Sequence, residues 1–81
     1  MDNSEIMETC KFIISGLPEC KGEIGLSDEE VEDYLKMVEN LKPQDVSRVL
    51  EVALKIRESG DIKNVDLKNE ASKLIRSIEE C

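Results

Sequence analysis

Carboxylates are the most numerous side chains that could do chemistry in this chain, and histidine is absent. The 81 residues contain 19 acidic and 11 basic side chains, three cysteines, no histidine and no tryptophan. Without an imidazole, the chain lacks the usual proton shuttle and the commonest metal ligand. A serine nucleophile would also have no histidine to activate it. The composition therefore predicts that the protein is not an enzyme, with no catalytic residue and no cofactor.

The cysteines, Cys10, Cys20 and Cys81, do not form a metal-binding or redox motif. No two of them have the CxxC spacing, and no histidine can complete a zinc site. Cys10 falls on an apolar stripe, so we expect it to be a small core residue. Cys20 lies in an expected loop and Cys81 stands last in the sequence, so both are predicted to be exposed. We predict no metal site, and free thiols in a reducing compartment.

The densest group of carboxylates lies in residues 27–33, Ser-Asp-Glu-Glu-Val-Glu-Asp. This run does not match the calcium-loop pattern, which needs oxygen ligands at alternate positions and a central glycine. Ser27 and Glu30 have the spacing of a capping box, which marks the start of a helix. Acidic side chains are favourable at the N-terminus of a helix, where the helix dipole is positive. They would also attract a basic partner, and the acids expected to do so are Asp28, Glu29, Glu32 and Asp33.

Aliphatic side chains recur at helical spacing along the chain, which predicts an all-α fold. No stretch alternates with a period of two, so no strand is expected. The third expected helix is apolar over more than half of its circumference and should be the most central. We predict a compact four-helix bundle forming a single helical domain over residues 1–81. Its helices span residues 3–15, 28–41, 44–58 and 66–79, and residues 16–26 form a crossover loop.

Helix ends are expected at further positions. Asn64 or Asp66 should cap the last helix, because short polar side chains accept hydrogen bonds from the free amides of the first turn. Gly60 is predicted to end the third helix in a left-handed conformation.

Some large apolar side chains fall off the stripes that face the expected core. A bundle this small cannot bury all of them, so we predict an exposed apolar groove for a partner helix or a second copy of the chain. The alternative is that irregular helix crossings cover most of them. The residues predicted to make apolar contacts with a partner are Met7, Phe12, Met37, Val52 and Ile56.

Net charge narrows the class of partner. The formal charge is −8, which opposes direct binding to nucleic acid. The leading hypothesis is a small acidic protein–protein interaction module (an adaptor, subunit or inhibitor) whose apolar groove and acidic face bind a protein with a basic surface. The alternative is an acidic phage or mobile-element protein that mimics nucleic acid to inhibit a nucleic-acid-binding enzyme.

The sequence also predicts where the protein works. No run approaches the ~20 apolar residues that a membrane-spanning helix needs. The first residues, Met-Asp-Asn-Ser-Glu, are acidic, and no basic segment leads into an apolar one as in a secretory signal. We therefore expect a soluble intracellular protein of the cytoplasm or nucleus, without membrane contact.

Residues 71–78, Ala-Ser-Lys-Leu-Ile-Arg-Ser-Ile, resemble the closing helix of the N-terminal domain of transcription elongation factor S-II. The segment from Tyr34-Leu35-Lys36 through Pro43 resembles an earlier part of that four-helix fold. Ile78 stands where the family has a tryptophan, and the family's Ile-Gly stretch is missing from residues 52–57. The resemblance implies a docking domain for short peptide motifs in transcription proteins.

Overall fold

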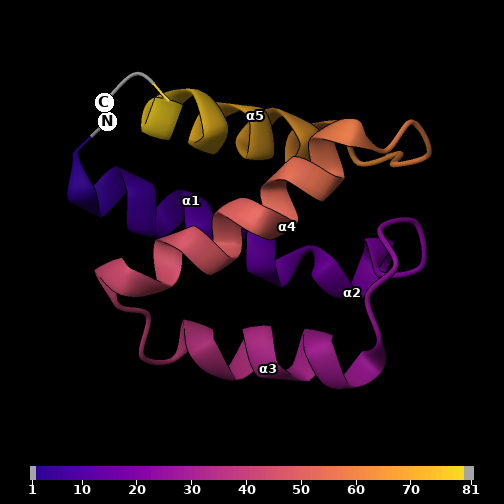
Figure 1. Ribbon diagram of the computed structural model, residues 1–81, viewed down its shortest axis with the longest axis horizontal. Coiled ribbons are helices and arrows are strands. Elements are labelled where there is room, and N and C mark those ends of the chain that lie inside the picture. The colour runs from indigo at the N-terminus through magenta and orange to yellow at the C-terminus, as the bar shows by residue number, and fades with distance from the viewer. Residues whose placement is uncertain (1, 80–81) are drawn as a thin grey trace.

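The computed structural model describes residues 2–79, and this part of the chain forms helices and no strands (Figure 1). The all-α prediction is therefore confirmed, and the helices pack compactly. Four of the helices are long. A single-turn helix, α2, follows the first of them, and a 3₁₀ turn, η1, precedes the third. The elements are α1 (Asn3–Ser15), α2 (Leu17–Cys20), α3 (Asp28–Val38), η1 (Pro43–Asp45), α4 (Val46–Glu58) and α5 (Val65–Glu79).

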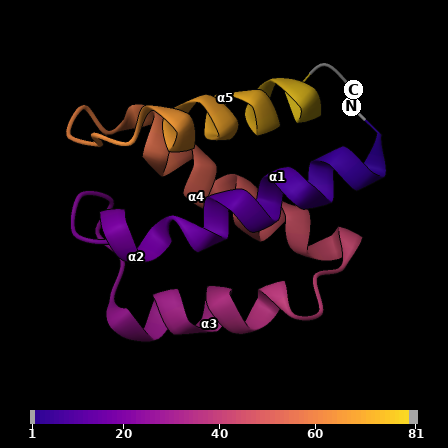
Figure 2. The ribbon, with the colours of Figure 1, turned by 180° about the vertical axis from the view of Figure 1, so that it is seen from behind.

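The helices α1 and α4 cross in the middle of the molecule, with α5 on one side and α3 on the other (Figures 1 and 2). α4 packs mainly against α5, and α1 contacts α3, α4 and α5. The predicted central helix is therefore central, and α1 shares that position. This arrangement brings α1 and α5, the first and last helices of the chain, side by side.

Most of the fully buried core comes from the apolar stripes of α1, α4 and α5, and α2 and α3 add further buried residues. On α5 the buried residues Leu67, Ala71, Leu74 and Ile75 follow one another at helical spacing. Burial of one such aliphatic side chain stabilises the fold by about 1.5–3 kcal/mol. The largest fully buried side chains are Ile13, Ile14, Leu17, Ile56, Leu67, Leu74, Ile75, Val49, Val52 and Cys10.

The predicted crossover loop contains a helical turn. α2 begins directly after Gly16 and has Pro18 in its first turn, where the missing amide proton and fixed φ of proline suit a helix start. Leu17 and Cys20 of this turn are 0% and 4% exposed. The prediction that Cys20 is exposed was therefore wrong, because the turn folds back onto the core.

The second long helix is shorter than predicted. α3 ends at Val38, and the backbone amide of Asn40 donates to the Met37 carbonyl in the turn that follows. Leu41 lies outside the helix but still packs against the core. Because Leu41 is apolar, it continued the helical spacing of apolar residues in the sequence beyond the observed end of α3.

The capping box of α3 is confirmed by its hydrogen bonds. The Ser27 amide donates to Glu30 Oε1 at 3.1 Å, and the Glu30 amide donates to Ser27 Oγ at 3.1 Å. At α5 the Leu67 amide donates to Asn64 Oδ1 at 3.1 Å, so Asn64 is the cap and Asp66 is not.

Gly60 does not adopt the predicted left-handed conformation. α4 ends at Ser59 with an extended backbone (φ −75°, ψ 127°). Within residues 2–79 the only positive φ belongs to Gly25, at 72°. The chain therefore leaves α4 by straightening into residues 60–64 and not by a left-handed turn.

Tyr34 joins α3 to α4. Its hydroxyl donates to the Arg48 carbonyl oxygen at 3.3 Å, and Arg48 Cζ lies 5.5 Å from the centre of the Tyr34 ring. A guanidinium at this distance is attracted to the face of an aromatic ring. These two contacts tie α3 to the first turn of α4.

Candidate functional site

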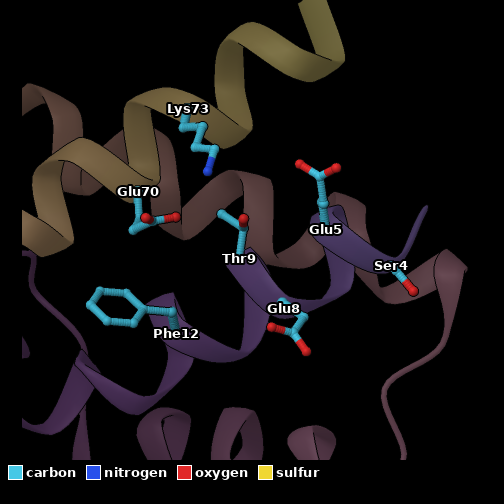
Figure 3. Close-up of a pocket in the computed structure, with 7 residues that line it drawn as sticks. All are labelled: Ser4, Glu5, Glu8, Thr9, Phe12, Glu70 and Lys73. Carbon is cyan, nitrogen blue, oxygen red and sulfur yellow. The ribbon is translucent and has the colours of Figure 1, made fainter. Parts of the chain in front are cut away.

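A hollow with a volume of about 330 Å³ lies between α1 and α5 (Figure 3). We call it the α1–α5 groove. Its size is at the lower end of the range for ligand pockets, about 300–1,000 Å³, so it suits one or two side chains of a partner. Its lining residues are Ser4, Glu5, Glu8, Thr9 and Phe12 of α1 and Glu70 and Lys73 of α5.

Helical spacing places these residues on one side of α1. Glu5, Glu8, Thr9 and Phe12 follow one another at intervals of three, one and three residues, which keeps them on one face. This stripe lies beside the buried stripe of α1. Figure 3 shows Thr9 pointing toward α5, whereas the Glu8 carboxylate points away from it.

Phe12 provides the apolar end of the groove. Its side chain is 44% exposed, although a phenyl ring has no polar atom to bind water. Figure 3 shows the ring at one end of the groove, beside the carboxylate of Glu70. Its position away from the core agrees with the sequence prediction, and it leaves an aromatic face open to a ligand.

The rest of the groove is mostly negative. Three carboxylates, from Glu5, Glu8 and Glu70, line it with one ammonium group, from Lys73. Within residues 2–79 the recorded ion pair is Lys21 with Asp28, which lies elsewhere. The charges of the groove are thus not neutralised by ion pairs within the described chain, and the groove favours a cation.

Thr9 forms the floor of the groove. It is 5% exposed and is the buried polar residue of the described chain. No hydrogen bond of its hydroxyl is found among residues 2–79, and the side chain rises from α1 toward Glu70 and Lys73 (Figure 3). No buried side-chain nitrogen or oxygen atom among residues 2–79 lacks a hydrogen-bond partner, so the Thr9 hydroxyl is open to the groove and is not a buried, unsatisfied group.

Sequence reasoning identified Phe12 but missed its neighbours in the groove. The stripe of Glu5, Glu8 and Phe12 is visible in the sequence as a helical repeat. The contribution of Glu70 and Lys73 is not, because it depends on α5 packing beside α1 across some sixty residues of chain.

Two other predicted contact residues lie apart from the α1–α5 groove. Met7 is half-buried and lines a separate hollow of about 210 Å³ where α1 begins, together with Ile6, Pro43 and Val46. Met37 is also half-buried and packs against the core from α3. The predicted single apolar patch is therefore divided.

Val52 and Ile56 do not lie on the surface. They are 2% and 0% exposed and belong to the core. The prediction that they contact a partner requires these two side chains to be exposed, and their burial contradicts it. α1 covers one side of α4 and α5 covers another, so a wider arc of this helix is buried than one stripe.

The acidic run of α3 is exposed, as expected. Asp28, Glu29, Glu32 and Asp33 all face solvent, and Asp28 pairs with Lys21. α3 lies on the opposite side of α1 from α5 (Figure 2), so these acids are separate from the α1–α5 groove. Within residues 2–79 no group of three or more histidine, cysteine or acidic side chains could hold a metal ion.

Cys10 and Cys20 are buried free thiols. Burial raises the pKa of the Cys10 thiol to about 11. Burial also raises the pKa of Cys20, and the nearby carboxylates of Glu23 and Glu19 raise it further. Because the thiolate is the reactive form, neither residue is suited to nucleophilic chemistry. The predicted exposure of Cys81 lies outside the described residues.

No protein-family model, curated protein or solved structure matches this chain. The resemblance of residues 71–78 to the elongation factor domain thus stays a prediction. None of the helices in the described part of the chain is long and apolar enough to cross a membrane.

Proposed function

We propose that this chain is a small protein–protein interaction module whose α1–α5 groove receives a basic segment of a partner protein. The observation that carries the proposal is the exposed ring of Phe12, 44% accessible, beside carboxylates that are not engaged in ion pairs. An aromatic anchor in a concave site is the usual centre of a protein interface.

The two parts of the groove would have different effects on binding. The Phe12 ring would supply apolar contact area and so slow dissociation. The carboxylates of Glu5, Glu8 and Glu70 would attract a basic segment and mainly raise the association rate. The acids of α3 would add to the long-range attraction without touching the bound segment.

Mimicry of nucleic acid would place the contact on a different surface. A mimic would bind through Asp28, Glu29, Glu32 and Asp33 of α3, and its affinity would fall steeply with salt. A groove-based module depends on Phe12 and should be less sensitive to salt. The two functions can therefore be distinguished by whether binding is abolished by a substitution in α1 or by substitutions in α3.

The experiment is a comparative capture from an extract of the source organism, using immobilised wild-type protein, Phe12→Ala and Leu35→Ala. Leu35 is a matched control, because it is a large apolar side chain of similar exposure, 39%, on α3. The proposal predicts a protein that wild type and Leu35→Ala retain and Phe12→Ala loses. Equal capture by all three variants would contradict it, and so would loss only when the α3 acids become amides.

A further inference from the structure

We propose that α3 acts as a lid, which opens as a unit while α1, α4 and α5 remain packed together. The proposal concerns a movement within the fold and does not depend on the binding of a partner in the α1–α5 groove. It rests on the shallow burial of α3, on the contacts that attach it, and on the places where its two connecting segments are fixed.

Among the four long helices, α3 has the shallowest burial. Its buried residues are Val31 and Tyr34, which are 5% and 8% exposed. Each of α1, α4 and α5 has at least three side chains that are 0% exposed. Most of the stability of a helix in a protein comes from the packing of its apolar face, so α3 is the long helix that detaches most readily.

The attachment of α3 depends mainly on Tyr34. α3 lies at one edge of the molecule and packs on α1 and α2 (Figures 1 and 2). Within residues 2–79, its recorded polar and ring contacts with other elements are those of Tyr34 with Arg48 and the ion pair of Asp28 with Lys21. Both side chains of this ion pair are exposed, and exposed ion pairs contribute little to stability. Tyr34 is therefore the latch that holds α3 to α4.

The charges of α3 make it a weak helix on its own. Asp28 and Glu32, and likewise Glu29 and Asp33, are carboxylates four residues apart, and like charges at this spacing destabilise a helix. α3 has 11 residues, and isolated helices shorter than about 12–15 residues are marginal in water. Once it detaches from the bundle, α3 therefore loses its helical hydrogen bonds.

The segments on both sides of α3 are fixed to the rest of the fold. Before the helix, Ile24 and Leu26 are buried. After it, the Lys42 amide donates to Asp45 Oδ2 at 3.0 Å, which fixes the entry into α4. The lid therefore consists of residues 27–41, and its opening exposes the sides of α1 and α2 that α3 now covers.

The test is native-state amide hydrogen exchange of the ¹⁵N-labelled protein at urea concentrations below the unfolding transition. The amides of residues 32–38 should exchange through one shared opening, with protection at least about tenfold lower than that of the slowest amides in α1, α4 and α5. The urea dependence of this opening should be clearly smaller than that of global unfolding, because the slope scales with the surface exposed.

Two substitutions separate the lid from the rest of the fold. Tyr34→Phe removes the hydroxyl of the latch and should speed exchange in α3 roughly two- to tenfold, as for the loss of one hydrogen bond. Ile75→Val removes one buried carbon from α5 and should speed exchange of the slowest amides in α1, α4 and α5 by roughly the same factor. Ile75→Val should leave exchange in α3 unchanged, because α5 stays packed when the lid opens.

The proposal is overturned if the amides of residues 32–38 show the urea dependence of global unfolding, or if Ile75→Val speeds them as much as it speeds those of α5. In either case α3 opens only with the whole fold. It is also overturned if these amides respond neither to urea nor to Tyr34→Phe, because α3 then only frays. The capture experiment with Phe12→Ala tests the proposed function separately, since Phe12 lies on α1 and not on the lid.

Discussion

Gly16 lies so close to Leu67 that a methyl group at Gly16 would stand 2.9 Å from Leu67 Cδ1. Gly16 ends α1, and Leu67 is fully buried in the first turns of α5. The missing side chain therefore lets the end of α1 approach α5.

We predict that Gly16→Ala destabilises the protein by about 1–3 kcal/mol, the usual cost of overpacking a core. The backbone of Gly16 (φ −88°, ψ −8°) suits alanine, so the loss comes from the contact with Leu67. Gly22→Ala is the control, because nothing lies within 4 Å of a methyl group there. Chemical denaturation measures both, and equal stability of the two variants would contradict the close packing of α1 on α5.

Ile56→Ala should destabilise the protein by about 2–5 kcal/mol, because it opens a cavity in the core. Phe12→Ala should cost roughly 1 kcal/mol or less, as for other surface substitutions. The comparison separates a core residue from a contact residue, since sequence reasoning placed both in one patch. Similar losses of stability, measured by thermal melting, would show that Phe12 is also part of the core.

The capping box of α3 predicts a response to acid. Hydrogen bonds from the backbone and side chain of Ser27 lower the pKa of Glu30 below its ordinary value of 4.5. Because this pKa is lower in the folded state, the charged Glu30 side chain stabilises the fold at pH values above its ordinary pKa. This contribution is lost as the pH falls through the lowered pKa. The difference in unfolding free energy between wild type and Glu30→Gln should therefore shrink from pH 7 to about pH 3. A difference that stays constant over this range would contradict the capping role.

The Cys10 thiol should make the protein less stable in alkali. Its pKa is about 11 in the folded state against an ordinary 9.0. The raised pKa gives a contribution to stability that is complete below pH 9 and is lost as the pH rises through 11.

In a Cys81→Ser background, the native protein should react with a thiol reagent at pH 8 far more slowly than the unfolded protein. Immediate reaction of Cys10 in the native protein would contradict its burial.

The helix positions were largely predictable because buried apolar residues recur at helical spacing in each long helix. α1 has the predicted bounds, and the start of α3 follows from the Ser27 capping box. The errors at Leu41 and Cys20 have one cause, since both residues pack against the core from outside a long helix. Apolar character reports burial, and it does not report whether the backbone is helical.

The site was less predictable than the fold. The exposure of Phe12 followed from its place off the α1 stripe, whereas Val52 and Ile56 were assigned wrongly because two helices cover α4. The burial of Thr9 has no distinctive sequence pattern, because it comes from the packing of α5 beside α1. Pairing between helices far apart in the chain is a tertiary property that spacing alone does not encode.

The central claim is that the α1–α5 groove binds a partner through Phe12. The most direct test is calorimetric titration of the purified captured partner into wild type and into Phe12→Ala, with folding of both checked by circular dichroism. We predict that the substitution raises Kd about tenfold or more, as for an aromatic residue at the centre of an interface. An unchanged Kd for a folded Phe12→Ala protein would contradict the claim.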